Sequence, residues 1–309
     1  MATTNTTKTL TVEAQTFYDR TLLERLTPNL VFAKYGQEKT LPKREGDKVN
    51  FRRFNSYEPA TTALTEGVTP QGKTVSITEV EAELKQYGDF TEYSDFIDMT
   101  GIDPVLTEIT EVHGEQASNT IDIVTRDVVC AGTNVIYSTG SATSAVTESD
   151  KLTSDLVRKA VRTLRRANAK PQEGAYFIGI VHPDVAADLM TDSLWQDVSK
   201  YNGGEEIKKG EIGRLCGVRF VETTNAKIKS GAGAGSADVY CTMIIGKGAY
   251  GTIKLEGAAK PQTIVKALGS AGTADPLNQR GTVGWKMPAY AVARLDELCM
   301  VRIETSATK

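Results

Sequence analysis

Apolar residues recur at two different spacings along the chain, and each spacing predicts a different kind of element. In residues 48–52 and again in residues 79–85, apolar and polar residues alternate with a period of two. This alternation is typical of strands that bury only one face. The two segments are therefore predicted to be the two arms of a long hairpin.

About twenty turn-prone residues, 55–74, separate these arms. A compact domain rarely holds a structureless loop of that length unless the loop has a use. We therefore expect the loop to reach out and contact something else, and a plain surface loop is the alternative.

The strongest helical pattern covers about residues 103–130, where Asp103 is the expected cap and Pro104 occupies the first turn. Its apolar stripe consists of Val105, Ile109, Val112, Ala117, Ile121, Val124 and Val128. Acidic residues occupy much of the remaining surface, namely Glu108, Glu111, Glu115 and Asp122. At 1.5 Å per residue this helix would be roughly 42 Å long, so it is predicted to be a spine.

A stretch rich in Ser, Thr and Gly, residues 137–149, is typical of a linker or exposed loop. Before it, we expect an extended or disordered arm over 1–12, a short helix over 15–26, and an extended segment over 29–47. After it the pattern is α/β. The predicted helices are 154–167 and 183–190, and the predicted strands are 176–181, 217–222, 239–245, 262–267, 281–285 and 298–303.

Composition narrows the class of protein. The chain has 309 residues, of which 40% are hydrophobic and 24% charged, with a formal net charge of −3. No run approaches the roughly 20 apolar residues that span a bilayer, and the N-terminus has neither a basic nor an apolar stretch. We therefore expect no membrane association and no secretory signal. The slightly acidic balance also argues against general nucleic-acid binding.

Charge is concentrated in blocks. Residues 34–53 contain seven basic and three acidic residues, a balance of +4, whereas residues 76–122 contain twelve acidic residues and one lysine, a balance of −11. Residues 151–170 return to +6. Such blocks are either solvated faces or complementary patches on neighbouring subunits. The arginines on one side of the 154–167 helix are most simply solvated, with an acidic partner or packaged nucleic acid as the alternative.

Nine charged residues are the predicted subunit contacts: Lys48, Arg52, Arg53, Glu79, Glu81, Glu83, Glu108, Glu111 and Glu115. The three glutamates at 79, 81 and 83 share one strand face, where they would repel one another unless a basic partner covers them. That partner is either the basic residues of the facing arm or a neighbouring molecule.

Candidate chemistry is sparse. Four scattered cysteines without a CxxC pair predict reduced, buried thiols and no metal site. Gly246–Gly251 spells GxGxxG after an apolar strand, but residues 252–261 are too short for the phosphate-binding helix of a dinucleotide site. His182 is expected to cap a helix, and His113 to form a surface ion pair or pack against a neighbour. We predict no catalytic, cofactor-binding or metal-binding residue, and no enzyme.

The order of these elements resembles the major capsid proteins of tailed bacteriophages, whose fold also forms the floor of herpesvirus capsids. Residues 210–223 look like the segment of phage capsid proteins in which a glycine-rich turn leads into a strand. Residues 17–26, 281–292 and 295–303 are similar to the phage N-four-like family of major capsid proteins. The resemblance covers nearly the whole chain.

This resemblance implies an α+β fold with an N-terminal arm, an extended hairpin loop, a peripheral domain with a long spine helix, and an α/β axial domain. The implied limits are 1–47 for the arm, 48–88 for the hairpin, 89–150 for the peripheral domain, 151–260 for the axial domain and 261–309 for C-terminal strands that return to the peripheral domain.

The resemblance also implies function by assembly. Copies would form the hexamers and pentamers of an icosahedral shell around double-stranded DNA, within a virion assembled in the cytoplasm of a bacterial host. The chain leaves no room for the N-terminal scaffolding domain of some relatives, so a separate scaffolding protein is expected, together with a portal and a possible decoration protein. An encapsulin-type compartment of the same fold and a soluble α/β enzyme are the alternatives.

Overall fold

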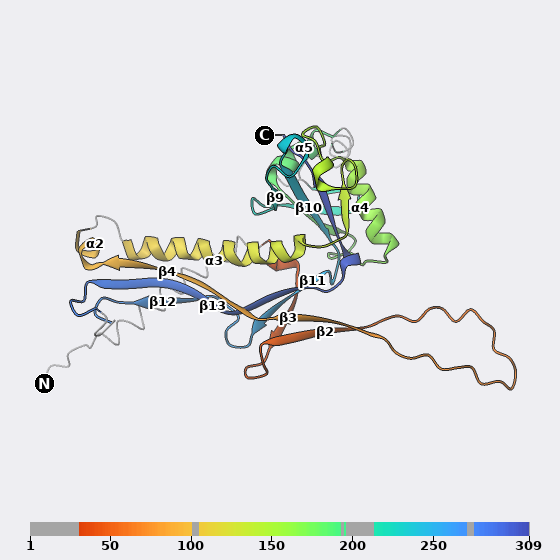
Figure 1. Cartoon of the computed structure of the whole chain (residues 1–309), viewed down its shortest axis with the longest axis horizontal. Coiled ribbons are helices and arrows are strands. Elements are labelled where there is room, and N and C mark those ends of the chain that lie inside the picture. Colours follow the sequence, from red (N-terminus) through yellow and green to blue (C-terminus); the bar gives the residue numbers. More distant parts are fainter. Residues whose placement is uncertain (1–30, 101–104, 193–194, 196–212, 271–274, 309) are drawn as a thin grey trace.

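The computed structural model describes residues 31–100, 105–192, 195, 213–270 and 275–308. The chain is elongated, with a long helix lying along a sheet, a lobe at one end of that helix, and a hairpin that extends beyond the body (Figure 1).

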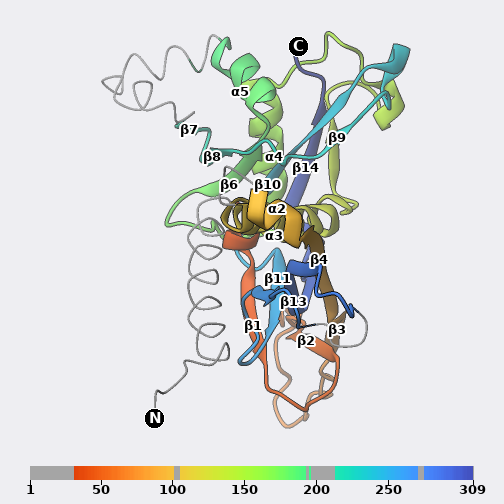
Figure 2. The same ribbon diagram turned by 90° about the vertical axis from the view of Figure 1, so that its left-hand side faces the viewer.

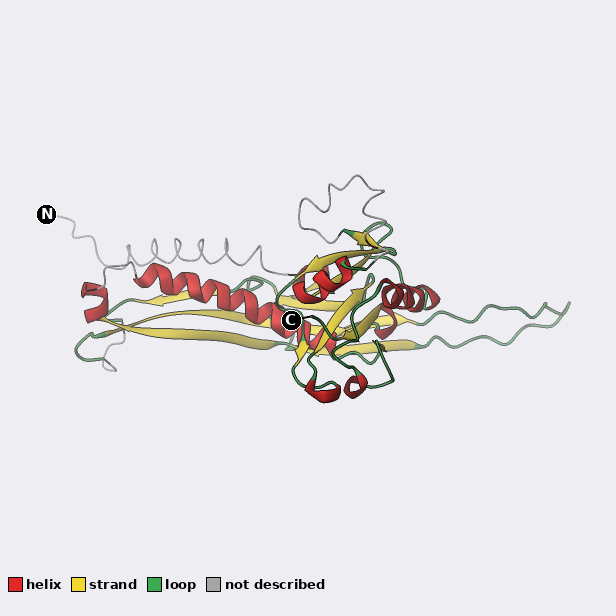
Figure 3. Cartoon of the chain, turned by 90° about the horizontal axis from the view of Figure 1, so that it is seen from above, coloured by secondary structure: helices red, strands yellow, loops and turns green. Residues whose placement is uncertain are grey.

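The long body consists of a sheet and one helix. The five strands of this sheet, here called the spine sheet, are β1 (Gln37–Leu41), β11 (Tyr250–Leu255), β13 (Arg280–Arg294), β12 (Gln262–Lys266) and β4 (Lys85–Ser94). Helix α3 (Val105–Cys130) lies along it, and Figure 3 shows the two side by side from above. Ala117 and Ile121 of α3 pack on Trp285, Met287 and Tyr290 of β13.

Strand β13 links the two ends of the spine sheet. Residues 280–287 and, past a register shift, Tyr290 pair with β4. Residues 282–286 also pair with β12, and residues 290–294 pair with β11. The register shifts between Met287 and Tyr290, where Pro288 lies. A proline has no N–H for the ladder, so it fits a strand only at such an irregularity.

The lobe contains a second sheet, here called the lobe sheet. Its strands, in spatial order, are β5 (Val135–Tyr137), β14 (Met300–Thr305), β10 (Val239–Ile245), β6 (Phe177–Val181), β8 (Val218–Glu222) and β7 (Arg214–Leu215), and β9 (Ile228–Lys229) also pairs with β10. Helices α4 (Ser154–Arg166) and α5 (Pro183–Met190) supply apolar side chains to one core on this sheet. Phe32, Tyr35 and the end of α3 form a separate core with the same sheet.

The hairpin is the third unit. Strands β2 (Lys48–Phe54) and β3 (Ile77–Glu83) pair antiparallel, and Val49 and Ala82 turn inward onto Ile253 and Ala291 of the spine sheet. Residues 55–76, here called the arm, continue past the paired region with no helix or strand, as the green trace in Figure 3 shows. Short elements complete the described chain: η1 (Ala33–Tyr35), α2 (Asp95–Thr100), η2 (Thr143–Ala145), η3 (Ala234–Ser236) and η5 (Glu297–Cys299).

The spine helix is present, but its predicted faces are partly wrong. Val112, assigned to the apolar stripe, is 62% exposed, whereas Asp122 and His113, assigned to the solvent side, are buried. The face that packs against the body passes through Thr110, Ala117 and Thr125, so polar groups lie within it. The predicted cap at 103–104 and the predicted helix at 15–26 lie outside the described residues.

Strand pairing also refines the predicted domain organisation, whose limits otherwise stay a prediction. Residues 29–47 contain a strand that the sequence did not reveal, because β1 pairs in parallel with β11. Strand β11, placed with the axial domain, belongs to the spine sheet. Strand β14, expected to return to the peripheral domain with β12 and β13, pairs instead with β10 in the lobe sheet.

Candidate assembly surfaces

The GxGxxG segment is a turn between the two sheets. Strand β10 ends at Ile245, and β11 begins at Tyr250, so a strand follows the glycines where a dinucleotide site needs a helix. Close packing explains the glycines: a Cβ on Gly246 would lie 2.9 Å from the Lys170 carbonyl oxygen, and one on Gly251 would lie 2.7 Å from the Phe51 ring. Gly248 has a φ of +75°, which favours glycine.

Neither histidine is arranged for catalysis. His182 is the N-cap of α5, and its Nδ1 accepts a hydrogen bond from the Asp184 N–H at 3.3 Å, as the helix-start pattern predicts. His113 is only 4% exposed, so the predicted surface ion pair is wrong; its Nδ1 lies 3.1 Å from the Gln116 Oε1. That amide oxygen also accepts from the Trp285 indole, which ties the ring into the contact between α3 and the spine sheet.

The cysteines are free thiols. Cys130 and Cys241 are buried, and burial raises the pKa of Cys130 to about 12 and that of Cys241 to about 11. Cys216 and Cys299 are only partly buried, in contrast to the prediction of four buried thiols. Within the described residues no cluster of His, Cys, Asp or Glu side chains has the arrangement of a metal site. The described helices include none that is long and apolar enough to cross a membrane.

The charged face of the hairpin is internally paired. Lys48 Nζ lies 2.5 Å from Glu81 Oε1, and Arg52 Nε lies 3.2 Å from Glu79 Oε1 across the β2–β3 ladder. The hydrogen bond and the charge of Glu81 raise the pKa of Lys48. Arg53 pairs with Asp296 beside the spine sheet. The sequence left open whether the glutamates of β3 pair with the facing strand or with a neighbouring molecule. In the isolated chain, Lys48 and Arg52 of the facing strand β2 pair with Glu81 and Glu79.

The remaining predicted contacts lie on the surface of the hairpin and of α3. Glu83 is exposed opposite Lys48, and Glu108 and Glu115 are exposed on the first half of α3, where Glu111 is half-buried. Val112 adds an apolar side chain to this acidic face. The role of all nine predicted residues as contacts between subunits stays a prediction.

The arm carries apolar side chains that no described part of its own subunit covers. Leu64 is 77% exposed and Val68 is 62% exposed, one on each side of a turn in which the Val68 N–H donates to the Thr65 carbonyl at 3.2 Å. Glu66 lies in that turn. Closer to the body, Phe54, Tyr57 and Val75 are also exposed.

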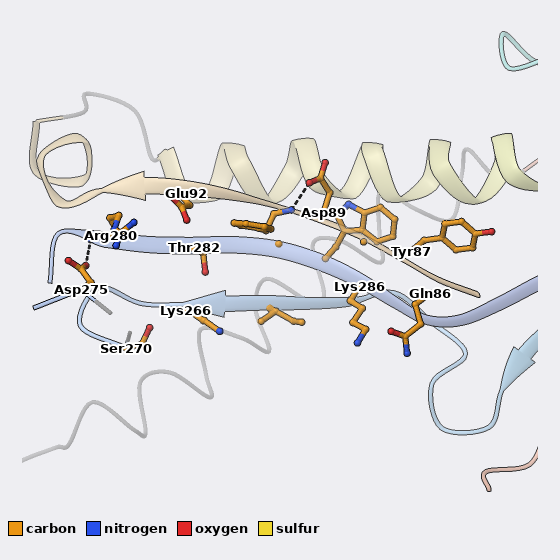
Figure 4. A pocket seen from close by; sticks show the side chains of 15 residues that line it. Gln86, Tyr87, Asp89, Glu92, Lys266, Ser270, Asp275, Arg280, Thr282 and Lys286 are labelled. Carbon is orange, nitrogen blue, oxygen red and sulfur yellow. Dashed lines mark hydrogen bonds between the residues drawn. The ribbon is translucent and has the colours of Figure 1, made fainter. Parts of the chain in front are cut away.

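A groove of about 780 Å³ lies on the face of the spine sheet opposite α3 (Figure 4). Phe90, Gly284 and Ile264 form a row across β4, β13 and β12. The glycine lets Phe90 approach closely, because a Cβ on Gly284 would lie 2.7 Å from the Phe90 Cβ. Phe90 is 63% exposed. Lys286 lies on one side of this row and Lys266 on the other, and Figure 4 shows both side chains pointing to the same side of the sheet.

Two buried carboxylates, which sequence reasoning missed, hold the elements together. Asp122 of α3 accepts hydrogen bonds from the backbone N–H groups of Val31 and Phe32 and from the side-chain amide of Asn225. Glu304 of β14 lies 2.5 Å from Lys229 Nζ and accepts from Thr143 at 2.6 Å. No sequence signal marks them, because an acidic residue on an amphipathic pattern is ordinarily read as exposed.

The fold is that of known phage capsid shells. The chain is similar to the capsid protein of cyanophage Pam1, with a TM-score of 0.68 at 17% identity over 92% of each chain. It is also similar to that of cyanophage P-SCSP1u, with a TM-score of 0.67 at 14% identity over 90% of this chain and 89% of the other. The capsid of Ralstonia phage GP4 gives 0.67 at 14% identity over 89% and 88%. No curated protein sequence matches the chain.

The sequence itself matches the phage capsid protein family over residues 77–303. Since this match covers most of the chain, the protein belongs to the phage capsid protein family. The predicted tailed-phage major capsid fold and a structural role in the virion capsid are confirmed. Neither the encapsulin-type compartment nor the soluble enzyme is favoured.

Proposed function

We propose that copies of this chain form the hexamers and pentamers of an icosahedral shell that encloses double-stranded DNA, and that the arm of each copy packs on a neighbour. The arm is the observation that carries the proposal. Twenty-two residues, 55–76, extend beyond the body while exposing Leu64, Val68 and Tyr57. An exposed apolar segment of this kind is typical of a surface that another molecule covers.

The groove on the spine sheet supplies a matching receptor for the arm. Its floor is apolar at Phe90 and Ile264, and Lys286 and Lys266 flank it, with Glu92 also lining the groove on the Lys266 side. The tip of the arm has the complementary pattern, with two apolar side chains around Glu66. We therefore assign Leu64 and Val68 of one copy to the groove of the next.

The partners implied beyond the shell are a separate scaffolding protein, a portal and a possible decoration protein, with assembly in the host cytoplasm. The family resemblance alone supports these partners. Among the partners other than further copies of this chain, packaged DNA is the one for which the chain has a candidate binding surface.

The test is deletion of Thr61–Gln71, which removes the tip and leaves the β2–β3 ladder intact. We expect soluble subunits with unchanged melting temperature that fail to form shells, as seen by negative-stain microscopy and sedimentation. Phe90→Ser is the matched change on the receptor: because this ring is exposed in the isolated subunit, it should reduce shell yield and leave subunit stability unchanged. Normal shells from the deletion would contradict the proposal.

A further inference from the structure

Helix α4 presents a cationic face that the described part of its own subunit does not neutralise. Leu156, Val157, Ala160, Val161 and Leu164 are buried in the lobe core. The opposite side, here called the cationic face, consists of Arg158, Lys159, Arg162, Arg165 and Arg166, all exposed. At 3.6 residues per turn these five side chains lie within an arc of about 120°. They form one stripe along the helix.

Few carboxylates reach this stripe. Arg158 pairs with Asp155 at 2.6 Å, one turn earlier on the same helix. The side chains of Lys159, Arg162, Arg165 and Arg166 have no ion pair or hydrogen bond among the described residues. Four adjacent cations therefore keep their charge uncompensated, and holding them together on one helix face costs free energy through mutual repulsion. A bound polyanion would remove this cost.

The stripe also lacks what a protein partner needs. Central parts of protein–protein interfaces contain few charges and are rich in aromatic and apolar side chains. Among the described residues, the exposed large apolar side chains lie on the hairpin and its arm, α2, α3, the sheets and the segments around residues 277 and 298, and none lies between residues 151 and 170. A face of pure positive charge without an apolar anchor instead suits the phosphate backbone of a nucleic acid, which is contacted mainly through Arg and Lys.

We infer that the cationic face of α4 binds the phosphate backbone of double-stranded DNA without sequence preference. This inference rests on the proposed function, because DNA is then the polyanion enclosed by the shell. It also orients the subunit, since α4, at the edge of the lobe in Figure 1 and beside α5 in Figure 2, then faces the interior. The −11 balance over residues 76–122 repels DNA from that part of the surface, whereas the +4 block over residues 34–53 does not.

The test uses unassembled full-length subunits and a linear random-sequence DNA duplex, with binding followed by fluorescence anisotropy over a series of salt concentrations. Four phosphate contacts predict a slope of log affinity against log salt of about −3.6, so affinity should fall about 100-fold between 50 and 200 mM salt. Arg162→Glu with Arg166→Glu should weaken binding at low salt and reduce that fall to about tenfold. Arg162→Lys with Arg166→Lys should retain binding.

Lys43→Glu with Lys260→Glu is the matched control, because both lysines are exposed outside α4 and the change in net charge is the same. It should bind DNA like the unaltered protein. The inference is overturned if the α4 double reversal binds DNA normally, whatever its effect on shells. If that reversal abolishes shells but leaves DNA binding intact, the face is a contact with an acidic protein surface. If the unaltered protein forms no shells yet binds DNA through α4, the proposed function fails and the inference stands.

Discussion

At the scale of single residues, Asp122 and Glu304 are both buried carboxylates whose surroundings shift their pKa values in opposite directions. Burial raises the pKa of Asp122 above its ordinary value, and hydrogen bonds from Asn225, Phe32 and Val31 offset this only in part. Burial also acts on Glu304, but hydrogen bonds from Lys229 and Thr143 outweigh it and lower the pKa. Neutral donors surround the first carboxylate, and two cations surround the second.

The raised pKa of Asp122 predicts how its contribution to stability depends on pH. The folded state binds this proton more tightly than the unfolded chain, so the contribution is complete below the ordinary aspartate pKa of about 3.9 and is lost as pH rises through the folded pKa. Asp122→Asn cannot titrate, and the Asn225 amide can turn to match it. The free energy of unfolding of Asp122→Asn minus that of the unaltered subunit should therefore grow between pH 4 and 7.

Urea unfolding of unassembled subunits at several pH values measures this difference, and a constant difference would count against a raised pKa. Asp122→Ala provides the comparison. It leaves the backbone N–H groups of Val31 and Phe32 without an acceptor. It should therefore lower stability at every pH, by about 1–3 kcal/mol for each donor left unpaired.

The contribution of Glu304 to stability depends on pH in the opposite direction. Its carboxylate is fully buried and pairs with both Lys229 and Arg302. Glu304→Gln should destabilise the subunit by about 3–5 kcal/mol at pH 7, because it leaves two cations without their anion. Since the pKa of Glu304 is lowered in the fold, its contribution is present above the ordinary glutamate value and is lost as pH falls through the folded pKa.

The free energies of unfolding of Glu304→Gln and of the unaltered subunit should therefore converge as the pH falls. Thermal or urea unfolding between pH 3 and 7 would show this. Glu256→Gln changes an exposed glutamate and serves as the control, with no measurable effect expected. Equal stability of Glu304→Gln and the unaltered chain at pH 7 would mean that the buried pair is replaceable at no cost.

At the scale of elements, prediction from sequence succeeds where a segment buries a full face between clear stops. Val239–Ile245 and Pro183–Met190 have the predicted bounds, because glycine or proline marks their ends and their apolar pattern is unbroken. Strands β1 and β4 were missed because most of their side chains are exposed. Strand β13 was predicted only over 281–285, because Pro288 hides the rest of its fifteen residues.

The candidate surfaces also differ in whether the sequence predicts them. The hairpin charges were found because alternation places them on one face, and the register confirms that Arg52 is opposite Glu79. The groove was not predicted, because Phe90, Gly284 and Ile264 come from three strands and meet only through pairing. The buried role of Asp122 was missed for a similar reason: its donors at 31, 32 and 225 are far away in sequence.

The hairpin ladder carries its own prediction. Arg52→Glu with Arg53→Glu removes the pairs with Glu79 and Asp296 and places like charges together. Exposed pairs contribute only about 0–1 kcal/mol each, so melting of the isolated subunit should fall slightly, and the fall should shrink at 1 M salt, where the Debye length is about 3 Å.

The predicted subunit contact adds a second readout, because shell yield should fall far more than subunit stability if these arginines also reach a neighbour. A compensating Glu79→Arg tests the pair within the hairpin and should recover melting. Glu81→Lys with Glu83→Lys tests the predicted contact and should recover some shells. An unchanged shell yield after the double reversal would remove both arginines from the subunit contacts.

At the scale of the whole molecule, the arrangement separates surfaces by chemistry. The arm and the groove are apolar with a few charges, the paired strands of the hairpin carry balanced charges, α3 is acidic, and the cationic face lies on α4 of the lobe. A shell protein needs such a separation, because contacts with its own copies and contacts with enclosed DNA must not compete. The family match and the shared fold establish the class of protein, and these surfaces propose how one copy meets the next.

The break in strand pairing at Pro288 has a consequence for the geometry of the shell. Residues 288 and 289 have no paired partner, so the spine sheet has two hydrogen-bonded parts, and β4 connects them past this strip through the single pair of Lys85 with Tyr290. Identical subunits close a polyhedral shell only if each subunit tolerates unequal angles with its neighbours. A change of angle at residues 288 and 289 strains only the pair of Lys85 with Tyr290, whereas elsewhere along β13 it would strain an uninterrupted ladder, so the subunit bends most easily here.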